Sequence, residues 1–227
     1  MPWYATNGVR SLREMAALIR TGAQRALELD PGEIAPRFLL GAIAAGLDFD
    51  WNAAAEHFRV AMASPAVSSE AHWAYASFYL NPLGRLEEAA AAMQRAVEQD
   101  PLHGSWRGIF SHHLVEIGKL QEATREIQKV LELEENHWIA NHTLSYIYLI
   151  EGRFDEALRM AERAHQANPR HSMPTGLLAA ALVGIGETDR ARELFRQMGD
   201  SPTPIWGRVE YHLFCSEIEE AAAWYKR

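Results

Sequence analysis

Small and apolar residues recur along the chain at intervals of 34 positions. One column of this self-alignment holds glycines, another holds alanines and a third holds large apolar residues: Gly84, Gly118, Gly152 and Gly186; Ala89, Ala123, Ala157 and Ala191; Leu80, Leu114, Tyr148 and Leu182. A shift of one residue would destroy all three columns. The pattern therefore indicates repeated copies of one structural unit.

Within a unit, apolar residues recur at helical spacing on both sides of the glycine. In one copy, Leu144 and Tyr148 precede Gly152, and Ala157 and Ala161 follow it. This spacing predicts two amphipathic helices joined by a tight turn at the glycine. Units end in helix breakers at Asp30-Pro31, Asp100-Pro101 and Asn168-Pro169. Because each helix pair needs its neighbours to bury its faces, the pattern predicts an all-α solenoid.

The period and the order of small, large, Gly, Ala and Pro positions resemble the tetratricopeptide repeat. This helix-turn-helix unit stacks into a right-handed superhelix. The resemblance covers residues 34–227 and implies about six repeats in one continuous solenoid, the last of them truncated. The repeats begin near Ile34, Glu70, Gly104, Trp138, Ser172 and Pro202. Residues 1–33 are expected to form an N-terminal segment with one capping helix, a half-repeat, within 8–30.

The first full repeat departs from this period. Ile34 and Glu70 are 36 positions apart, and Leu47-Asp48-Phe49-Asp50-Trp51 stands where the other repeats have their turn glycine. We expect an enlarged turn between the two helices of this repeat.

Two segments narrow the resemblance. The first is Asp50-Trp51 followed by Ala54, Ala55, Glu56 and Phe58. The second is Ala71-His72-Trp73-Ala74-Tyr75. Both resemble repeat arrays attached to bacterial class III nucleotide cyclases, serine/threonine kinases and winged-helix regulators. This resemblance implies a bacterial signalling or regulatory protein. Nothing in the sequence resembles the attached domains themselves, so their activities are not carried over to this chain.

In the tetratricopeptide-repeat family, the first helix of each repeat lines a concave groove. The resemblance implies a partner-binding groove that is mainly apolar and aromatic, formed by Phe38, Phe78, Asn81, His112, His142, Tyr146, Met173 and Trp206. The charged donors with which other family members hold a C-terminal carboxylate are missing from these positions. A peptide or protein with aliphatic or aromatic anchors is the expected occupant. The alternative is that Phe38, Phe78 or Tyr146 only packs against adjoining repeats.

The charge and the cysteine content limit the classes of partner and the cellular compartment that we expect. Lys and Arg total 22 against 30 Asp and Glu, a net charge of −8, and no basic stripe could follow a phosphate backbone. Nucleic acid is therefore not an expected partner. No apolar run is long enough to span a membrane, and residues 1–20 do not read as a signal peptide. The single cysteine, Cys215, fits a reducing compartment, and we expect a cytoplasmic protein.

The candidate chemistry is sparse. His112 and His142 fall at inward positions of successive first helices and could approach across the groove, but no further ligand completes a zinc site. Cys215 has His212 three positions away on the same helix and lacks an orienting group, which favours a structural thiol. We therefore predict neither catalysis nor a cofactor.

The expected function is recognition of a protein or peptide by an interaction scaffold. A homo-oligomerisation module, in which a second copy fills the groove or the open end, is the first alternative. A histidine-based metal or small-ligand site is the second. Trp224 and Tyr225 lie near the end of the sequence without a polar capping helix, which predicts a fragment of a longer protein or a self-associating chain.

Overall fold

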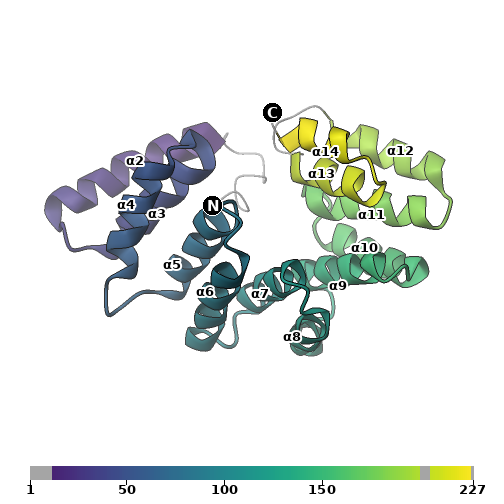
Figure 1. Cartoon of the computed structure of the whole chain (residues 1–227), viewed down its shortest axis with the longest axis horizontal. Coiled ribbons are helices and arrows are strands. Elements are labelled where there is room, and N and C mark those ends of the chain that lie inside the picture. The colour runs from purple at the N-terminus through teal and green to yellow at the C-terminus, as the bar shows by residue number, and fades with distance from the viewer. Residues whose placement is uncertain (1–11, 200–204, 226–227) are drawn as a thin grey trace. The chain divides into compact units, whose positions relative to one another are not determined.

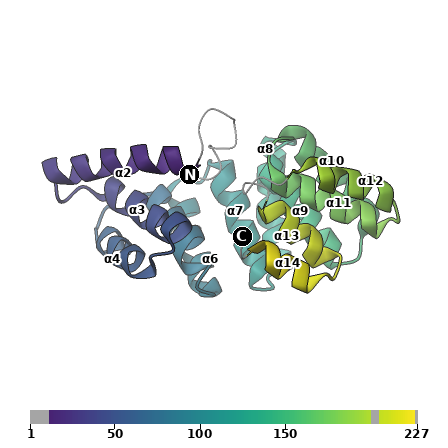
Figure 2. The ribbon, with the colours of Figure 1, turned by 90° about the horizontal axis from the view of Figure 1, so that it is seen from above.

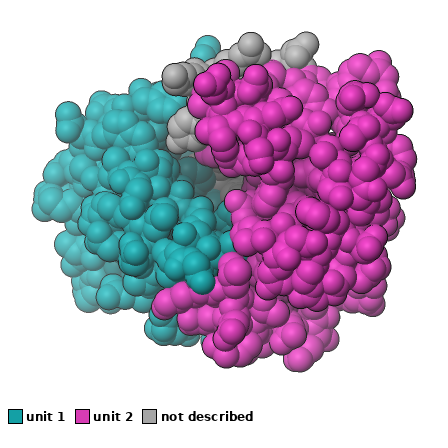
Figure 3. All heavy atoms as spheres, turned by 45° about the vertical axis from the view of Figure 1, so that its right-hand side comes forward, with its two compact units in different colours: residues 1–118 teal, residues 119–227 magenta. Residues whose placement is uncertain are grey.

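The computed structural model describes residues 12–199 and 205–225, and these residues form helices and connecting turns without a β-strand. The chain divides into two compact units, residues 1–118 and residues 119–227 (Figure 3). Within each unit, consecutive helices pack in antiparallel pairs, as the 34-residue pattern predicts. The described part of the protein is thus an all-α helical repeat solenoid.

The first unit holds the N-terminal helix and the first repeats. Its helices are α2 (Leu12–Leu29), α3 (Ile34–Ile43), α4 (Trp51–Met62), α5 (Ser69–Tyr75), α6 (Leu86–Gln99) and α7 (Gly104–Glu116) (Figure 1). Two π-helical turns extend α3 and α5: η1 (Ala44–Asp48) and η2 (Ala76–Leu80). Helix α2 falls within the range predicted for the N-terminal helix and packs against α3 (Figure 2).

The second unit holds the remaining helices. These are α8 (Leu120–Leu133), α9 (Trp138–Ile150), α10 (Phe154–Ala167), α11 (Ser172–Gly184), α12 (Thr188–Gln197), α13 (Ile205–Phe214) and α14 (Ile218–Tyr225). In this unit α11 packs against both α10 and α13. The predicted start of the last repeat, near Pro202, lies outside the described residues, and α13 and α14 form its helix pair.

The turn glycines have the conformation that the sequence predicts. Gly84, Gly118, Gly152 and Gly186 all have positive φ angles, between 71° and 86°. This left-handed region is accessible to glycine at little cost because glycine has no Cβ. The glycine column of the repeat therefore marks the ends of the first helices.

The expected enlarged turn of the first repeat is also present. Helix α3 widens into η1, and a π-helical turn accommodates more residues than an α-helical turn. Phe49 then adopts the left-handed conformation with φ of 54°, and its side chain is 70% exposed. Asp50 begins α4 by accepting a hydrogen bond from the backbone N–H of Ala53.

The alanine column forms the contact between helices. Ala89, Ala123, Ala157 and Ala191 are fully buried. Their small side chains allow neighbouring helices to approach closely. In one repeat the hydroxyl of Ser145 donates to the carbonyl oxygen of Ala157 at 2.8 Å, which ties the first helix to the second.

Candidate partner-binding surface

Three successive first helices begin at a histidine. The Nδ1 atoms of His103, His137 and His171 accept hydrogen bonds, each at 3.3 Å, from backbone N–H groups in the first turns of α7, α9 and α11. The three residues are 34 positions apart, so the self-alignment contains this column, although the sequence analysis did not identify it. These caps satisfy backbone donors that a helix leaves unpaired, and they fix the starts of the helices that carry the inward positions.

In the first unit, Phe78 belongs to an aromatic cluster. Its ring meets Trp73 edge-on at a centroid distance of 5.4 Å, and Trp73 contacts Trp106 at 5.2 Å. The ring also lies over the backbone of Gly46, where an added Cβ would be 3.5 Å away. Phe78 is half-buried, whereas both tryptophans are 8% exposed. Phe78 thus packs between repeats and still presents part of its ring at the surface.

Asn81 and His112, two of the predicted groove residues, meet at Glu116. The Nδ2 atom of Asn81 donates to Oε2 of Glu116 at 2.5 Å, and Nδ1 of His113 lies 2.8 Å from the same oxygen. The Nε2 atom of His112 is 3.8 Å from the other carboxylate oxygen, Oε1. The structure therefore adds Glu116 to this part of the surface, with the buried His113 as one of its hydrogen-bond partners. Sequence spacing could place both on α7 but could not place Asn81 beside them.

These neighbours keep the Glu116 carboxylate ionised. Burial raises the pKa of Glu116, but the hydrogen bond to His113 and the charges of His112 and His113 outweigh it and lower the pKa to about 2. The side chain is 27% exposed. A negative charge thus sits at a partly exposed position on the first helix of a repeat.

In the second unit, predicted groove residues contact residues of the last repeat. His142 on α9 is buried, and its Nε2 atom lies 3.2 Å from Oε2 of Glu210 on α13. One turn along the same helices, Tyr146 meets Phe214 edge-on at a centroid distance of 4.7 Å. Helix α11 lies between α9 and α13 in sequence, so these side chains reach past it to meet.

Two glycines on α11 and α13 account for this reach. A Cβ on Gly176 would overlap the backbone carbonyl oxygen of Gly207, and a Cβ on Gly207 would overlap that of Ser172. The two helix backbones therefore touch. Ala180, one turn further along α11, is also small and buried. Because this face of α11 carries no large side chain, residues of α9 and α13 can meet over it.

The remaining predicted groove residues differ in exposure. Phe38 on α3 is 9% exposed and contributes mainly to the core. Met173 is half-buried, and its backbone N–H donates to His171. Trp206 at the start of α13 is 53% exposed. Of the groove residues in the second unit, only Trp206 presents most of its surface to solvent.

Among the described residues, no side-chain cluster suits a metal ion, and the thiol of Cys215 favours its protonated form. Within residues 12–199 and 205–225, no group of three or more His, Cys, Asp or Glu side chains is arranged to hold a metal ion. Cys215 is half-buried, and burial raises the pKa of its thiol, which disfavours the reactive thiolate. No helix in this part of the chain is long and apolar enough to cross a membrane.

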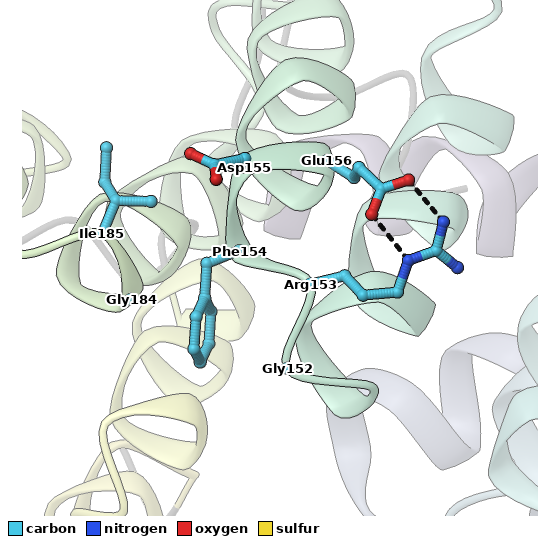
Figure 4. A pocket seen from close by; sticks show the side chains of 7 residues that line it. All are labelled: Gly152, Arg153, Phe154, Asp155, Glu156, Gly184 and Ile185. Atoms are coloured by element: carbon cyan, nitrogen blue, oxygen red, sulfur yellow. Dashed lines mark hydrogen bonds and ion pairs between the residues drawn. The ribbon is translucent and has the colours of Figure 1, made fainter.

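A pocket of about 380 Å³ lies at a turn of the second unit (Figure 4). Its lining includes Arg153, Phe154, Glu156 and Gly184. The guanidinium of Arg153 is paired with Glu156, with Nε at 2.6 Å from Oε2. Phe154 packs directly on Gly184, where a Cβ would overlap the ring. The pocket is thus a product of turn packing, and Arg153 and Glu156 in its lining are already paired with each other.

Comparison with known proteins identifies the repeat. One tetratricopeptide-repeat family model matches residues 148–201, and a second matches residues 69–101. The chain is a tetratricopeptide-repeat protein. No curated protein sequence matches the chain significantly.

Solved structures of similar fold cover most of this tetratricopeptide-repeat protein. One, described as the functional characterization of Pseudomonas aeruginosa pilF, is 20% identical with a TM-score of 0.64, covering 90% of this chain and 91% of that one. A tetratricopeptide repeat protein from Parabacteroides merdae is 17% identical with a TM-score of 0.64, covering 94% and 86%. YrrB, described as having an unusual peptide-binding site, is 15% identical with a TM-score of 0.52, covering 90% and 98%. At these identities the likeness establishes the fold alone.

Proposed function

We propose that this protein is a scaffold that binds a peptide or protein segment on the inward-facing residues of its first helices. Tetratricopeptide-repeat proteins are generally interaction scaffolds rather than enzymes, and the two family matches support that general role here. The observation that carries the proposal is the partly exposed ring of Phe78, which is supported from behind by Trp73 and Trp106. A rigid aromatic anchor of this kind is typical of residues that dominate binding energy.

The two units contribute differently in this proposal. His142 and Tyr146 are engaged by Glu210 and Phe214, so we assign them a role in shaping the second unit. Phe78, Asn81 and His112 in the first unit are the residues we propose to touch the partner. Trp206 offers a further exposed aromatic contact in the second unit. Phe38 and Met173 would contribute less to binding, because Phe38 is buried and Met173 is half-buried.

The wider setting of this proposal comes from the sequence. The segments around Trp51 and Trp73 support a place in a bacterial signalling or regulatory protein, and the single unpaired Cys215 is compatible with the cytoplasm. We propose neither a catalytic step nor a cofactor. A homo-oligomer that fills the same surface with a second copy is the competing outcome.

A pull-down with one variant and one matched control tests the proposed surface. Phe78→Ala removes the anchor, whereas Phe49→Gly removes an exposed aromatic side chain from the same unit away from the inward positions. We expect a protein recovered by the native chain and by Phe49→Gly to be lost with Phe78→Ala, provided circular dichroism shows all three chains folded. Direct titration with the purified partner should then give at least a tenfold weaker affinity.

Other results would overturn the proposal. Equal recovery by Phe78→Ala and by the native chain would remove Phe78 from the binding surface. Concentration-dependent sedimentation that Phe78→Ala abolishes would assign the surface to self-association instead.

A further inference from the structure

Glu116 differs from the arginine-paired carboxylates of the second helices in how its charge is balanced. Several exposed carboxylates on those helices pair with an arginine one turn away, as Glu56 does with Arg59 and Glu88 with Arg85. No Lys or Arg among the described residues forms an ion pair with Glu116, whose neighbours are two histidines and an asparagine. None of these neighbours carries the permanent charge of an arginine, so the carboxylate lacks a permanently cationic partner among the described residues.

The two carboxylate oxygens of Glu116 differ in their hydrogen bonding. Both short contacts, from Asn81 and His113, go to Oε2. Among the described residues, Oε1 has only the longer approach of His112 at 3.8 Å. The carboxylate is therefore fixed in orientation by one oxygen while the other retains capacity to accept a hydrogen bond. A fixed acceptor loses little conformational entropy when a ligand binds.

An apolar anchor lies close in sequence to one of these neighbours. Phe78 is in η2, and Asn81, which follows η2 directly, holds Glu116. The chain also carries a net charge of −8, which favours encounter with a basic partner. We define the Glu116 surface as Phe78, Asn81, His112 and Glu116.

We infer that the Glu116 surface binds a basic peptide segment, with a lysine or arginine of the partner against Oε1 of Glu116 and an apolar side chain against Phe78. The inference rests on the proposed function and specifies the chemistry of its partner. An ion pair supplies orientation and selectivity, and apolar contact with Phe78 supplies most of the attraction. Acidic segments would be rejected because the carboxylate would repel them.

Selection from a random phage-displayed peptide library on the full chain at pH 8 tests this inference. This pH lies above the unperturbed pKa of histidine, which limits competition from imidazolium groups. We expect the selected peptides to combine Lys or Arg with an aliphatic or aromatic residue. Titration of the best synthetic peptide should show about tenfold weaker binding to Glu116→Gln and unchanged binding to Glu98→Gln, which removes the same charge from an exposed site on α6.

A salt titration of the native chain checks the result without any substitution. Raising NaCl from about 50 to about 500 mM should weaken the selected peptide several-fold, because salt screens a partly exposed ion pair. This measurement decides the inference if Glu116→Gln does not fold.

The outcomes separate the inference from the proposed function. Selected peptides that lack basic residues, or that bind Glu116→Gln as well as the native chain yet bind Phe78→Ala weakly, would overturn the inference and leave the proposed function intact. Enrichment of acidic peptides would also overturn it and assign the site to the imidazoles. If no peptide is enriched, or if Phe78→Ala binds normally, both proposals fail.

Discussion

His142 and Glu210 form a buried contact of 3.2 Å between helices two repeats apart, although 68 positions separate them in the sequence. The contact joins α9 to α13 past the intervening α11. Burying either group without its partner costs free energy, because water no longer solvates it. Loss of either residue therefore removes the contact. The contact links the last repeat, α13 and α14, to the repeat formed by α9 and α10.

A double-mutant cycle on His142 and Glu210 measures this link. Each single alanine substitution removes this contact from a buried polar group, so we expect each to lower the free energy of unfolding by about 1–3 kcal/mol. The double variant should cost less than the sum of the two, with a coupling of about 1 kcal/mol or more. Urea unfolding followed by circular dichroism gives the values.

The exposed pair of Asp189 and Arg192, at 2.8 Å, provides the control cycle. Its coupling should stay below about 0.5 kcal/mol, because exposed ion pairs contribute little. Equal coupling in the two cycles would mean that burial does not strengthen the His142–Glu210 contact.

Substitution of Gly176 tests the backbone contact between α11 and α13. In Gly176→Ala the new methyl group would overlap the carbonyl oxygen of Gly207, and rigid backbone cannot yield cheaply. We expect a loss of about 3 kcal/mol or more in the free energy of unfolding, together with weakening of the Tyr146–Phe214 contact. Thermal and urea unfolding check the loss.

Gly22→Ala is the matched control. Gly22 is also helical, but nothing lies within 4 Å of an added Cβ. Alanine has the higher helix propensity, so this variant should be more stable by up to about 1 kcal/mol. A similar small gain from Gly176→Ala would show that the two helices are further apart than we describe.

The repeat and its turns were predictable from the sequence because they are local and periodic. The glycine column requires a left-handed turn at each copy, and the alanine column requires close helix packing. Both properties depend only on residue type and spacing. The histidine caps had the same 34-position signal, and an alignment that included polar residues would have revealed them.

The detailed surface was not predictable in the same way. Glu116 acquires its role from Asn81, which belongs to the preceding repeat. The engagement of His142 by Glu210 depends on how closely α11 and α13 approach, and that distance is set by the pairing of Gly176 with Gly207. Family positions indicate which residues face inward, but neighbouring side chains decide which of them remain accessible.

The left-handed conformation of Phe49 predicts a stabilising substitution. A residue with a Cβ costs about 1–2 kcal/mol in this region, whereas glycine adopts it readily. Because the side chain is 70% exposed, little burial is lost on its removal. Phe49→Gly should raise the free energy of unfolding by about 1 kcal/mol in a urea titration.

Two further variants separate the backbone effect from the side-chain effect at this turn. Phe49→Asn should stabilise less than glycine but in the same direction, because asparagine tolerates the left-handed region. Phe49→Val should destabilise, since β-branched residues tolerate it poorly. A loss of stability in all three variants would instead assign the Phe49 ring a packing role.

His171 predicts a dependence of stability on pH. Burial, followed by the nearby charge of His142, lowers the pKa of His171 from 6.5 to about 4. As the pH falls below about 6.5, the unfolded chain takes up the proton while the folded protein does not, so stability decreases. The loss should reach about 3 kcal/mol at pH 4, where about half of the folded protein is also protonated, and it should level off below that pH. Urea unfolding at intervals between pH 8 and pH 4 measures this slope.

His171→Asn isolates the contribution of this one residue. Asparagine accepts the same kind of hydrogen bond at the start of a helix, so the cap of α11 is kept while the titrating group is removed. The variant should lose less stability than the native chain between pH 6.5 and pH 4. The two curves should differ most near pH 4 and run parallel above pH 7, where the imidazole is neutral in both states. Parallel curves over the whole range would mean that His171 titrates alike in the folded and unfolded chains, and that its burial does not exclude the proton.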